Sequence, residues 1–461
     1  MKHALTTSAL LAAALLAALP ARAADNTTDS ALVERGRYLA TAGDCVACHT
    51  APGGKAMAGG LALASPVGAI YSTNITPSKT HGIGNYTLQQ FSAAVRHGKR
   101  ADGANLFPAM PYTSYAKTSD EDVAALYAFF MQGVAPVDAA APATALPFPF
   151  NLARPFLGVW NALFLDAAPY QADAAQSPEW NRGAYLAQGL AHCSTCHTPR
   201  NLLMAEDLKR SLGGSELGGW YAPNITPDAN SGIGNWSAQD LVRYMSGQPV
   251  PGKGSAAGPM VEAIDHSLRH LTPADLQAIA VYIKSVPAVV HAGARQPADS
   301  YGSQIDALAT IRGVALPKEH DAMTGPQLYD AYCAACHQAQ AQGSDDGSLP
   351  SLFHNASLGH ADSNNLVQVM LHGVPRYGVD SVMPGFAQEL SDTQITTLGN
   401  YVLASYGNPQ AQVSEPQVAR LRAPPSADTT LVTLARVGVA LGIIVVLALL
   451  AWLLRRRRRR A

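Results

Sequence analysis

One pentapeptide pattern occurs three times in this chain of 461 residues: CVACH at residues 45–49, CSTCH at 193–197 and CAACH at 333–337. In each copy, two cysteines are separated by two residues and followed directly by a histidine. This spacing brings both sulfurs and the imidazole to one helical turn, as covalent attachment of a c-type haem requires. The sulfurs would form thioether bonds to the porphyrin, and the histidine would ligate its iron.

The cysteine count supports this interpretation. The chain has six cysteines, and all of them belong to the motifs: Cys45, Cys48, Cys193, Cys196, Cys333 and Cys336. A thioredoxin-like dithiol and a cysteine-ligated zinc site are the alternatives for a Cys-x-x-Cys pair. Neither explains why histidine follows at the same offset in every copy. We therefore predict three covalently bound haem c groups, with His49, His197 and His337 as axial ligands.

A cytochrome that only transfers electrons is expected to carry a second axial ligand on each iron, and methionine in that place raises the reduction potential. Met110, Met260 and Met383 are the candidates, because each lies beside proline or glycine in a predicted loop of its unit. Such a loop can turn a thioether towards iron, whereas a helical methionine usually packs in the core. Packing remains the alternative for each one, but the recurrence in three units favours ligation. The other histidines, including His192 and His360, are predicted to lie at the surface or beside the ligands.

Both ends of the chain indicate export and membrane anchoring. Residues 1–23 resemble a signal peptide, with a basic start, an Ala/Leu-rich run at 4–19 and a small-x-small cleavage site at 21–23. Residues 431–454 are almost entirely apolar and long enough to span a bilayer core of about 30 Å. The six arginines in 455–461 are placed in the cytoplasm by the positive-inside rule. The rest of the chain is therefore expected to face the periplasm at the cell membrane.

Without these ends the charge balance changes. Segments 1–23 and 431–461 contain nine basic residues and no acidic ones, which leaves 23 basic against 33 acidic residues. The exported part is therefore strongly acidic. Nucleic-acid binding requires a basic face, so we expect no nucleic-acid partner.

The motifs divide the chain into three units. Units one and two are duplicated, because Asn-Ile-Thr-Pro at 74–77 recurs at 224–227 and Gly-Ile-Gly-Asn at 82–85 recurs at 232–235. The linkers are rich in proline, glycine and alanine and are expected to be extended. The predicted cytochrome c domains are 24–134, 177–286 and 323–408, and the predicted linkers are 135–176, 287–322 and 409–430.

Each unit is predicted to contain three helices, and no convincing strand series is present. The first helix leads into the haem motif, at 32–43, 181–189 and 325–335. The second follows a loop, at 88–97, 238–245 and 364–372, and the third closes the unit, at 120–131, 273–285 and 392–406. Ser119, Thr272 and Ser391 stand in N-cap positions. The predicted fold is mainly α, with three tandem cytochrome c-like domains and a C-terminal transmembrane helix.

With these features the chain resembles the three-haem cytochrome c subunit of bacterial membrane-bound dehydrogenases, which oxidise alcohols, gluconate and related polyols, or aldehydes. The resemblance covers nearly the whole mature chain. Its more specific marks are the paired Asn-Ile-Thr-Pro segments, Pro-Ala-Met-Pro-Tyr at 108–112 and Met-Pro-Gly-Phe at 383–386. It implies a separate catalytic subunit with a flavin, pyrroloquinoline quinone or molybdenum cofactor. Electrons would pass from that subunit through the cytochrome to membrane ubiquinone.

The residues themselves offer no site for activating an organic substrate. The sequence contains no dinucleotide fingerprint, metalloprotease histidine pair or defensible nucleophile–base arrangement, so no catalytic residue is assigned. Two alternatives to the dehydrogenase subunit stay open. One is a self-contained multihaem enzyme of peroxidase or thiosulfate-oxidising type, which requires an open sixth position on a haem; the other is an electron feeder to a terminal oxidase. Chain connectivity alone would place the third haem nearest the membrane.

Overall fold

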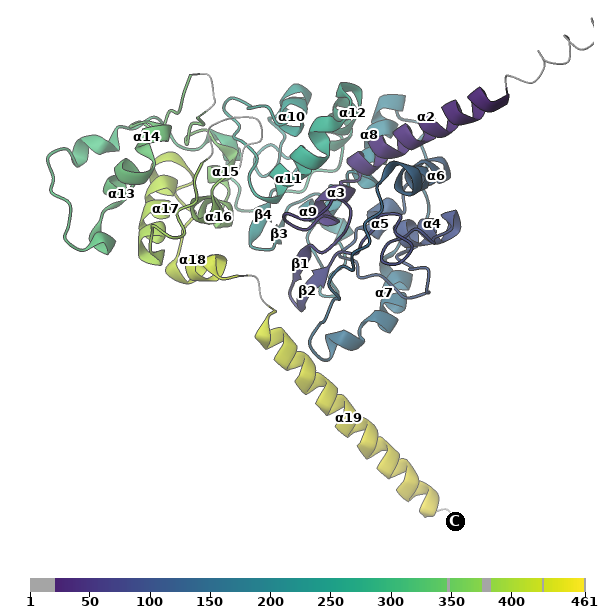
Figure 1. The fold of residues 1–461 in the computed structure, drawn as a ribbon. Coiled ribbons are helices and arrows are strands. Elements are labelled where there is room, and N and C mark those ends of the chain that lie inside the picture. The colour runs from purple at the N-terminus through teal and green to yellow at the C-terminus, as the bar shows by residue number, and fades with distance from the viewer. Residues whose placement is uncertain (1–20, 346–348, 375–382, 425–426, 460–461) are drawn as a thin grey trace, which may run out of the picture.

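The computed structural model describes residues 21–345, 349–374, 383–424 and 427–459. Figure 1 shows a body of packed helices, with unit three on the left, and one long helix, α19, that projects from it. The described chain is mainly helical, as predicted. Most of the predicted signal peptide lies outside the described residues, and residues 21–23 form the start of the first described helix.

Unit one runs from a helix through the first haem motif and a hairpin to further helices. β1 and β2 pair antiparallel, with Ala62 opposite Tyr71. Its elements are α2 (Ala21–Ala42), α3 (Cys45–Cys48), β1 (Ala62–Ser65), β2 (Gly68–Tyr71), α4 (Leu88–His97), α5 (Tyr112–Tyr115), α6 (Asp120–Ala128) and the π-helical turn η1 (Phe129–Gly133).

Unit two repeats this order. β3 and β4 again form a two-stranded antiparallel hairpin after the haem motif. Its elements are α8 (Pro178–Gln188), α9 (Ser194–His197), η4 (Leu208–Arg210), β3 (Ser215–Leu217), β4 (Trp220–Ala222), α10 (Ala238–Met245), α11 (Pro259–His266), η5 (Leu268–His270) and α12 (Pro273–Ile283).

Unit three has the same first, second and last helices, and its described residues contain no strand. Its elements are α13 (Gly325–Tyr332), α14 (Ala334–His337), α15 (Ala356–Gly359), α16 (Asn364–His372), α17 (Asp392–Tyr406) and α18 (Glu415–Arg422). Two hydrophobic cores result. One is shared by units one and two, and the other belongs to unit three.

The predicted helices are present, but the connections differ from the prediction. The middle helices coincide with α4, α10 and α16, and the last helix of unit three coincides with α17. The linkers are not simply extended, because apolar residues fold parts of them into short helices. Segment 409–430 contains α18, whose Val418 and Leu421 are buried in the core of unit three. The other linkers contain η2 (Phe150–Leu152), η3 (Arg154–Phe156), α7 (Leu157–Phe164), η6 (Ala298–Ser300), η7 (Ala307–Thr310) and η8 (His320–Ala322).

In each unit the first helix crosses the last helix at a glycine. A Cβ atom on Gly36 would overlap the carbonyl oxygen of Ala125, and one on Gly183 would overlap that of Ala278. In unit three a Cβ on Gly325 would overlap the side chain of Tyr401. Glycine has no Cβ and therefore permits this close approach. The crossing fixes where the first helix ends and the haem motif begins.

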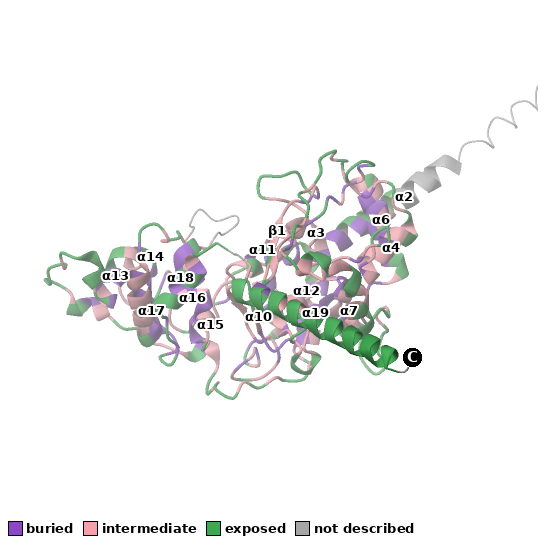
Figure 2. Cartoon of the chain, turned by 90° about the horizontal axis from the view of Figure 1, so that it is seen from below, coloured by how far each residue is buried: buried purple, intermediate pink, exposed green. Residues whose placement is uncertain are grey.

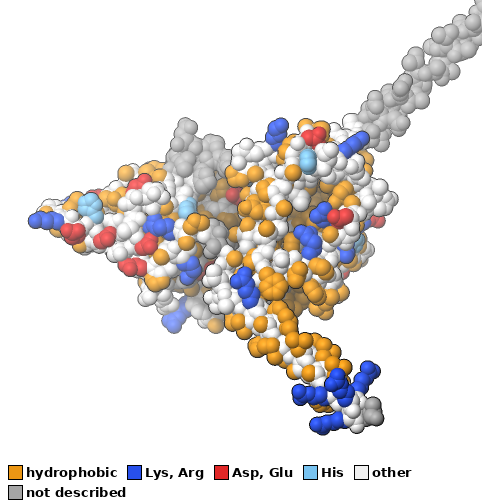
Figure 3. All heavy atoms as spheres, turned by 60° about the horizontal axis from the view of Figure 1, so that its bottom comes forward, with side chains coloured by type: hydrophobic (Ala, Val, Ile, Leu, Met, Phe, Trp, Pro, Cys, Tyr) orange, Lys and Arg blue, Asp and Glu red, His pale blue; other side chains and the backbone are white. Residues whose placement is uncertain are grey.

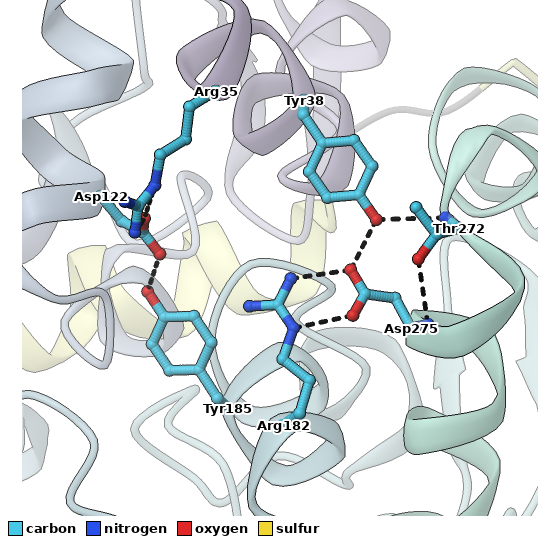
Figure 4. A network of polar contacts seen from close by, with 7 residues as sticks. All are labelled: Arg35, Tyr38, Asp122, Arg182, Tyr185, Thr272 and Asp275. Carbon is cyan, nitrogen blue, oxygen red and sulfur yellow. Dashed lines mark hydrogen bonds and ion pairs between the residues drawn. The ribbon is translucent and has the colours of Figure 1, made fainter. Parts of the chain in front are cut away.

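Units one and two are joined by a reciprocal set of polar contacts (Figure 4). Arg182 donates to both carboxylate oxygens of Asp275 within unit two, at 2.7 Å each. Tyr38 of unit one donates its hydroxyl to the same carboxylate at 2.5 Å. A carboxylate that is buried this deeply needs such partners, since an unpaired buried charge is costly.

The mirror arrangement occurs on the other side of the interface. Arg35 pairs with Asp122 within unit one, and Tyr185 of unit two donates to Asp122 at 2.5 Å. Both aspartates stand at the third position of the last helix, where the predicted N-caps Ser119 and Thr272 accept their backbone N–H groups. The N-caps are thus confirmed, while the aspartate side chains bind the partner unit instead of completing a capping box.

Unit three contacts unit two through the second hairpin. The backbone N–H of Tyr221 donates to Asn365 at 2.8 Å, and the Asn365 amide donates back to the Tyr221 carbonyl at 2.8 Å. Asn365 lies on α16 and Tyr221 on β4, so this helix and this strand form the contact.

The helix α19 spans Thr429–Arg458, and its most apolar 18 residues have a mean hydropathy of 2.9. Figure 2 shows it exposed along its length, as expected for a helix that reaches lipid rather than a protein core. Among the described residues it is the one helix long and apolar enough to cross a membrane. It contains the predicted span 431–454 and the first arginines of the tail.

The helix leaves the body beside unit one. The Asp428 N–H donates to the Pro66 carbonyl at 2.9 Å, and Arg436 donates to the Phe148 carbonyl at 3.1 Å. Pro66 connects β1 and β2, whereas the third motif, on α14, lies on the far side of the body in Figures 1 and 2. The expectation from chain connectivity is therefore wrong. The chain returns from unit three to unit one before it enters α19.

We expect the crossing glycines to be needed for stability. Gly183→Ala should lower the free energy of unfolding by about 1–3 kcal/mol, because the new methyl group forces α8 away from α12. Urea unfolding of the haem-loaded chain measures this loss. Gly293→Ala is the control, since a Cβ at that position meets no atom within 4 Å. Equal stability of the two variants would contradict the crossing argument.

The contact between units one and two should weaken in acid. Burial alone would raise the pKa of Asp275, but hydrogen bonds from Arg182 and Tyr38 outweigh it and hold the pKa below its usual value. The stabilisation is therefore complete above the unfolded pKa of about 4 and is lost as pH falls through the lower, folded pKa. Between neutral and acid pH, the urea concentration at the unfolding midpoint should decrease less for Asp275→Asn than for the wild type. Asp330→Asn is the control, because Asp330 is exposed and this variant should respond to pH as the wild type does. An equal loss of stability in acid for Asp275→Asn and the wild type would contradict the role given to Asp275.

Candidate functional site

Each haem motif forms a single helical turn directly after the first helix of its unit. In unit one the turn α3 contains both Cys45 and Cys48. In units two and three the first cysteine is the N-cap of α9 or α14, and the histidine is the last helical residue. All six cysteines are free thiols in the structure, as attachment of haem requires.

The three motif histidines are oriented by the same kind of bond. In each, Nδ1 lies against a backbone carbonyl oxygen, which can only accept. The proton must then be on Nδ1, and the lone pair of Nε2 is directed away for ligation. The bonds run from His49 to Thr73 (2.6 Å), from His197 to Pro223 (2.7 Å) and from His337 to Pro350 (2.9 Å).

Burial adjusts the protonation of these residues. It lowers the pKa of His49, His197 and His337, although the bond to the carbonyl opposes the shift. The imidazoles are therefore neutral near pH 7, which is the form that binds iron. Burial also raises the pKa of the Cys45 and Cys193 thiols to about 12.

A cavity of about 570 Å³ joins the second and third motifs. Most of its wall is apolar, which suits a porphyrin. The residues predicted to hold haem line it from both units: Cys193, Cys196, His197, Met260, Cys333, Cys336, His337 and Met383. Asp44, beside the first motif, also borders it. The cavity therefore brings together the complete sets of predicted haem residues of units two and three. It also reaches the start of the first motif, in unit one.

Comparisons with known proteins agree with this geometry. The family described as "Cytochrome c" matches residues 33–133, and the family described as "Cytochrome C oxidase, cbb3-type, subunit III" matches residues 320–402. The chain is 46% identical to the fructose dehydrogenase cytochrome subunit of Gluconobacter japonicus, over 99% of this chain and 98% of that protein. The chain belongs to the family of dehydrogenase cytochrome c subunits.

Two further relatives support this assignment. The gluconate 2-dehydrogenase cytochrome c subunit of Pantoea cypripedii is 41% identical, over 87% of this chain and 91% of that protein. The cytochrome c subunit of the quinone alcohol dehydrogenase of Gluconobacter oxydans is 37% identical, over 86% of this chain and 83% of that protein. Cytochrome c domains bind haem c covalently, and the paired thiols beside an apolar cavity fit that group in this dehydrogenase cytochrome c subunit.

The structure places the three candidate methionines differently. Met383 borders the cavity and forms a β-bridge with Val374, outside any helix. Met110 lies in a turn before α5 and packs against the core shared by units one and two. Met260 also borders the cavity, but it is the second residue of α11, because Pro259 starts a helix at that point. The predicted loop location is therefore wrong for Met260.

Several groups at the sites carry little or no sequence signal. The carbonyls that accept from the motif histidines belong to the backbone of Thr73, Pro223 and Pro350, so no side chain identifies them. Proline at two of these positions is a weak marker. Burial and then the charge on Glu262 raise the pKa of Asp44 to about 8. His360, which was predicted to lie at the surface or beside the ligands, borders the cavity and packs edge-on against Tyr221.

If Met260 ligates iron, its removal should change one haem. Met260→Ala should convert one low-spin, six-coordinate haem of the oxidised protein to a high-spin species that binds cyanide readily. Met245→Ala is the matched control, because Met245 also borders the cavity but is buried on the helix α10. Visible and electron paramagnetic resonance spectra distinguish the two results. Identical spectra for the two variants would assign Met260 to packing.

Proposed function

We propose that this chain is the electron-transfer subunit of a membrane-bound dehydrogenase and carries three haem c groups. It would accept electrons from a separate catalytic subunit that oxidises an alcohol, a sugar or polyol such as gluconate, or an aldehyde, and pass them to ubiquinone. The observation that carries the proposal is the cavity shared by the second and third motifs and bordered by the first. The names of the three relatives supply the class of partner.

The residues of the chain have distinct tasks in this proposal. The six cysteines would attach the haems, and His49, His197 and His337 would ligate them, with each imidazole held in one tautomer by a backbone carbonyl. Met110, Met260 and Met383 would supply a second protein ligand to each iron, so that small ligands would be excluded. Haem c, when bound, supplies a one-electron redox centre. No residue of the chain acts on the organic substrate.

The position of α19 supports an orientation of the complex. We propose that α19 crosses the cell membrane with its arginines in the cytoplasm and with the three units in the periplasm, after removal of residues 1–23. Unit one then lies next to the bilayer, because Asp428 contacts its β-hairpin and Arg436 contacts the connection that follows it. Unit three lies on the far side (Figure 1). The catalytic subunit would therefore meet unit three, and ubiquinone would be reduced near unit one.

Reconstitution tests this function. The haem-loaded chain in lipid nanodiscs containing ubiquinone should show no haem reduction when substrate alone is added. Addition of the catalytic subunit should produce both reduced haem and ubiquinol, followed by absorbance. Met383→Ala should slow ubiquinol formation, since it alters the haem that is proposed to accept electrons first. Met323→Ala, at the start of unit three and outside the cavity lining, is the control.

Each part of the proposal has its own contrary result. Haem reduction by substrate without the catalytic subunit would indicate a self-contained enzyme. Haem reduction without ubiquinol would leave electron transfer intact and exclude ubiquinone as the acceptor. Normal rates in Met383→Ala would contradict the assigned role of the third haem.

A further inference from the structure

The short helix α7, in the connection between units one and two, has its polar and apolar faces reversed. Asn161 points into the protein, where it accepts the Tyr112 hydroxyl at 2.7 Å. The apolar side chains point out, and Phe156, Val159 and Leu163 are 70%, 63% and 65% exposed. These three residues repeat at helical spacing and so form one face. A helix in contact with water is expected to show the opposite arrangement.

The surrounding connection is almost uncharged. Residues 139–165 contain a single charged side chain, Arg154. Its guanidinium donates to the Asn105 carbonyl at 2.7 Å and lies 4.6 Å from the centre of the Phe107 ring. The one charge is thus directed towards unit one, and the outward face is left without any.

Unit two extends this apolar region. The Trp160 indole donates to the Leu203 carbonyl at 2.9 Å and ties α7 to the loop that follows the second haem motif. That loop also exposes large apolar side chains. We call the combined region the outer apolar surface: Phe148, Leu152, Phe156, Val159, Leu163, Leu202, Leu203, Met204 and Leu208.

The outer apolar surface begins where the membrane helix begins. Arg436, in the third turn of α19, donates to the carbonyl of Phe148, which is itself part of this surface. Figure 3 shows hydrophobic side chains gathered around the place where α19 leaves the body. Large exposed apolar patches mark contacts with protein or membrane. Continuity with a helix suited to span the bilayer favours the membrane here.

We propose that the outer apolar surface rests in the bilayer that α19 spans, with α7 lying in the plane of the interface. This inference relies on the anchoring role of α19 in the proposed function. Interfacial helices bury their apolar face about 5–10 Å into the boundary between headgroups and acyl chains. Phe156, Val159 and Leu163 would enter that layer, while Asn161 stays bound to unit one. The body would then be held against the membrane at two places, by α19 and by α7.

A nitroxide label on the full, haem-loaded chain in lipid nanodiscs tests this contact. All six native cysteines are consumed by haem attachment in the proposed holoprotein, so Val159→Cys provides the single reactive thiol. Collision rates with oxygen, which concentrates in lipid, and with a water-soluble nickel chelate report the surroundings of the label. The oxygen-to-nickel ratio should be several-fold higher at 159 than at an exposed position in water. Leu163→Cys provides a second label on the same face.

Two reference positions separate the possible failures. Val314→Cys is the matched control, since Val314 is 56% exposed and lies in the connection between units two and three. Val445→Cys reports on the middle of α19. A lipid-like ratio at 445 together with a ratio at 159 and 163 equal to that at 314 would overturn the surface contact and leave the anchor intact. A water-like ratio at 445 would overturn the anchor. Lower collision rates of the label at 159 with both oxygen and the nickel chelate, seen only after the catalytic subunit is added, would identify a protein contact and also overturn the inference.

Discussion

The close crossing of the first and last helices is the constraint on which each unit depends. Gly36 and Gly183 let the first helix touch the backbone of the last helix, and Gly325 lets it approach the side chain of Tyr401. The haem motif begins within a few residues of the end of the first helix. The position of the motif is therefore set by a helix that lies far along the chain. A carbonyl from the intervening loop then fixes the histidine ring. The first helix, the last helix and the loop between them therefore together orient Nε2 of the motif histidine.

Much of this organisation could be predicted from the sequence, and the reason is repetition. Three copies of a motif, a duplicated loop and caps such as Thr272 have local signals that recur, so the helices and the candidate ligands followed from them. The resemblance to known cytochrome subunits added the class of partner. The missing parts have no local signal. Strands of three or four residues are too short for an alternating pattern, and Tyr38 and Tyr185 become significant only when two units meet.

The contact between units one and two follows from their duplication. Each unit contributes the same kinds of residue, and each tyrosine binds the aspartate of the other unit. Such an interface is isologous, like that of a symmetric dimer, although both halves belong to one chain. A shared core joins these two units, while unit three keeps a core of its own. The chain is therefore organised as a fused pair with an additional unit attached through β4 and α16.

The cavity between units two and three also constrains how the protein matures. Cys196 and Cys336 both border it, on walls that come from different units. Thioether formation requires these sulfurs to be reached by a porphyrin and by the machinery that attaches it. Once α16 contacts β4, units two and three both border the cavity, and access of the porphyrin and of this machinery to the sulfurs is restricted. If the proposed haems occupy this cavity, their insertion would therefore precede the docking of unit three, and that docking would enclose both cofactors.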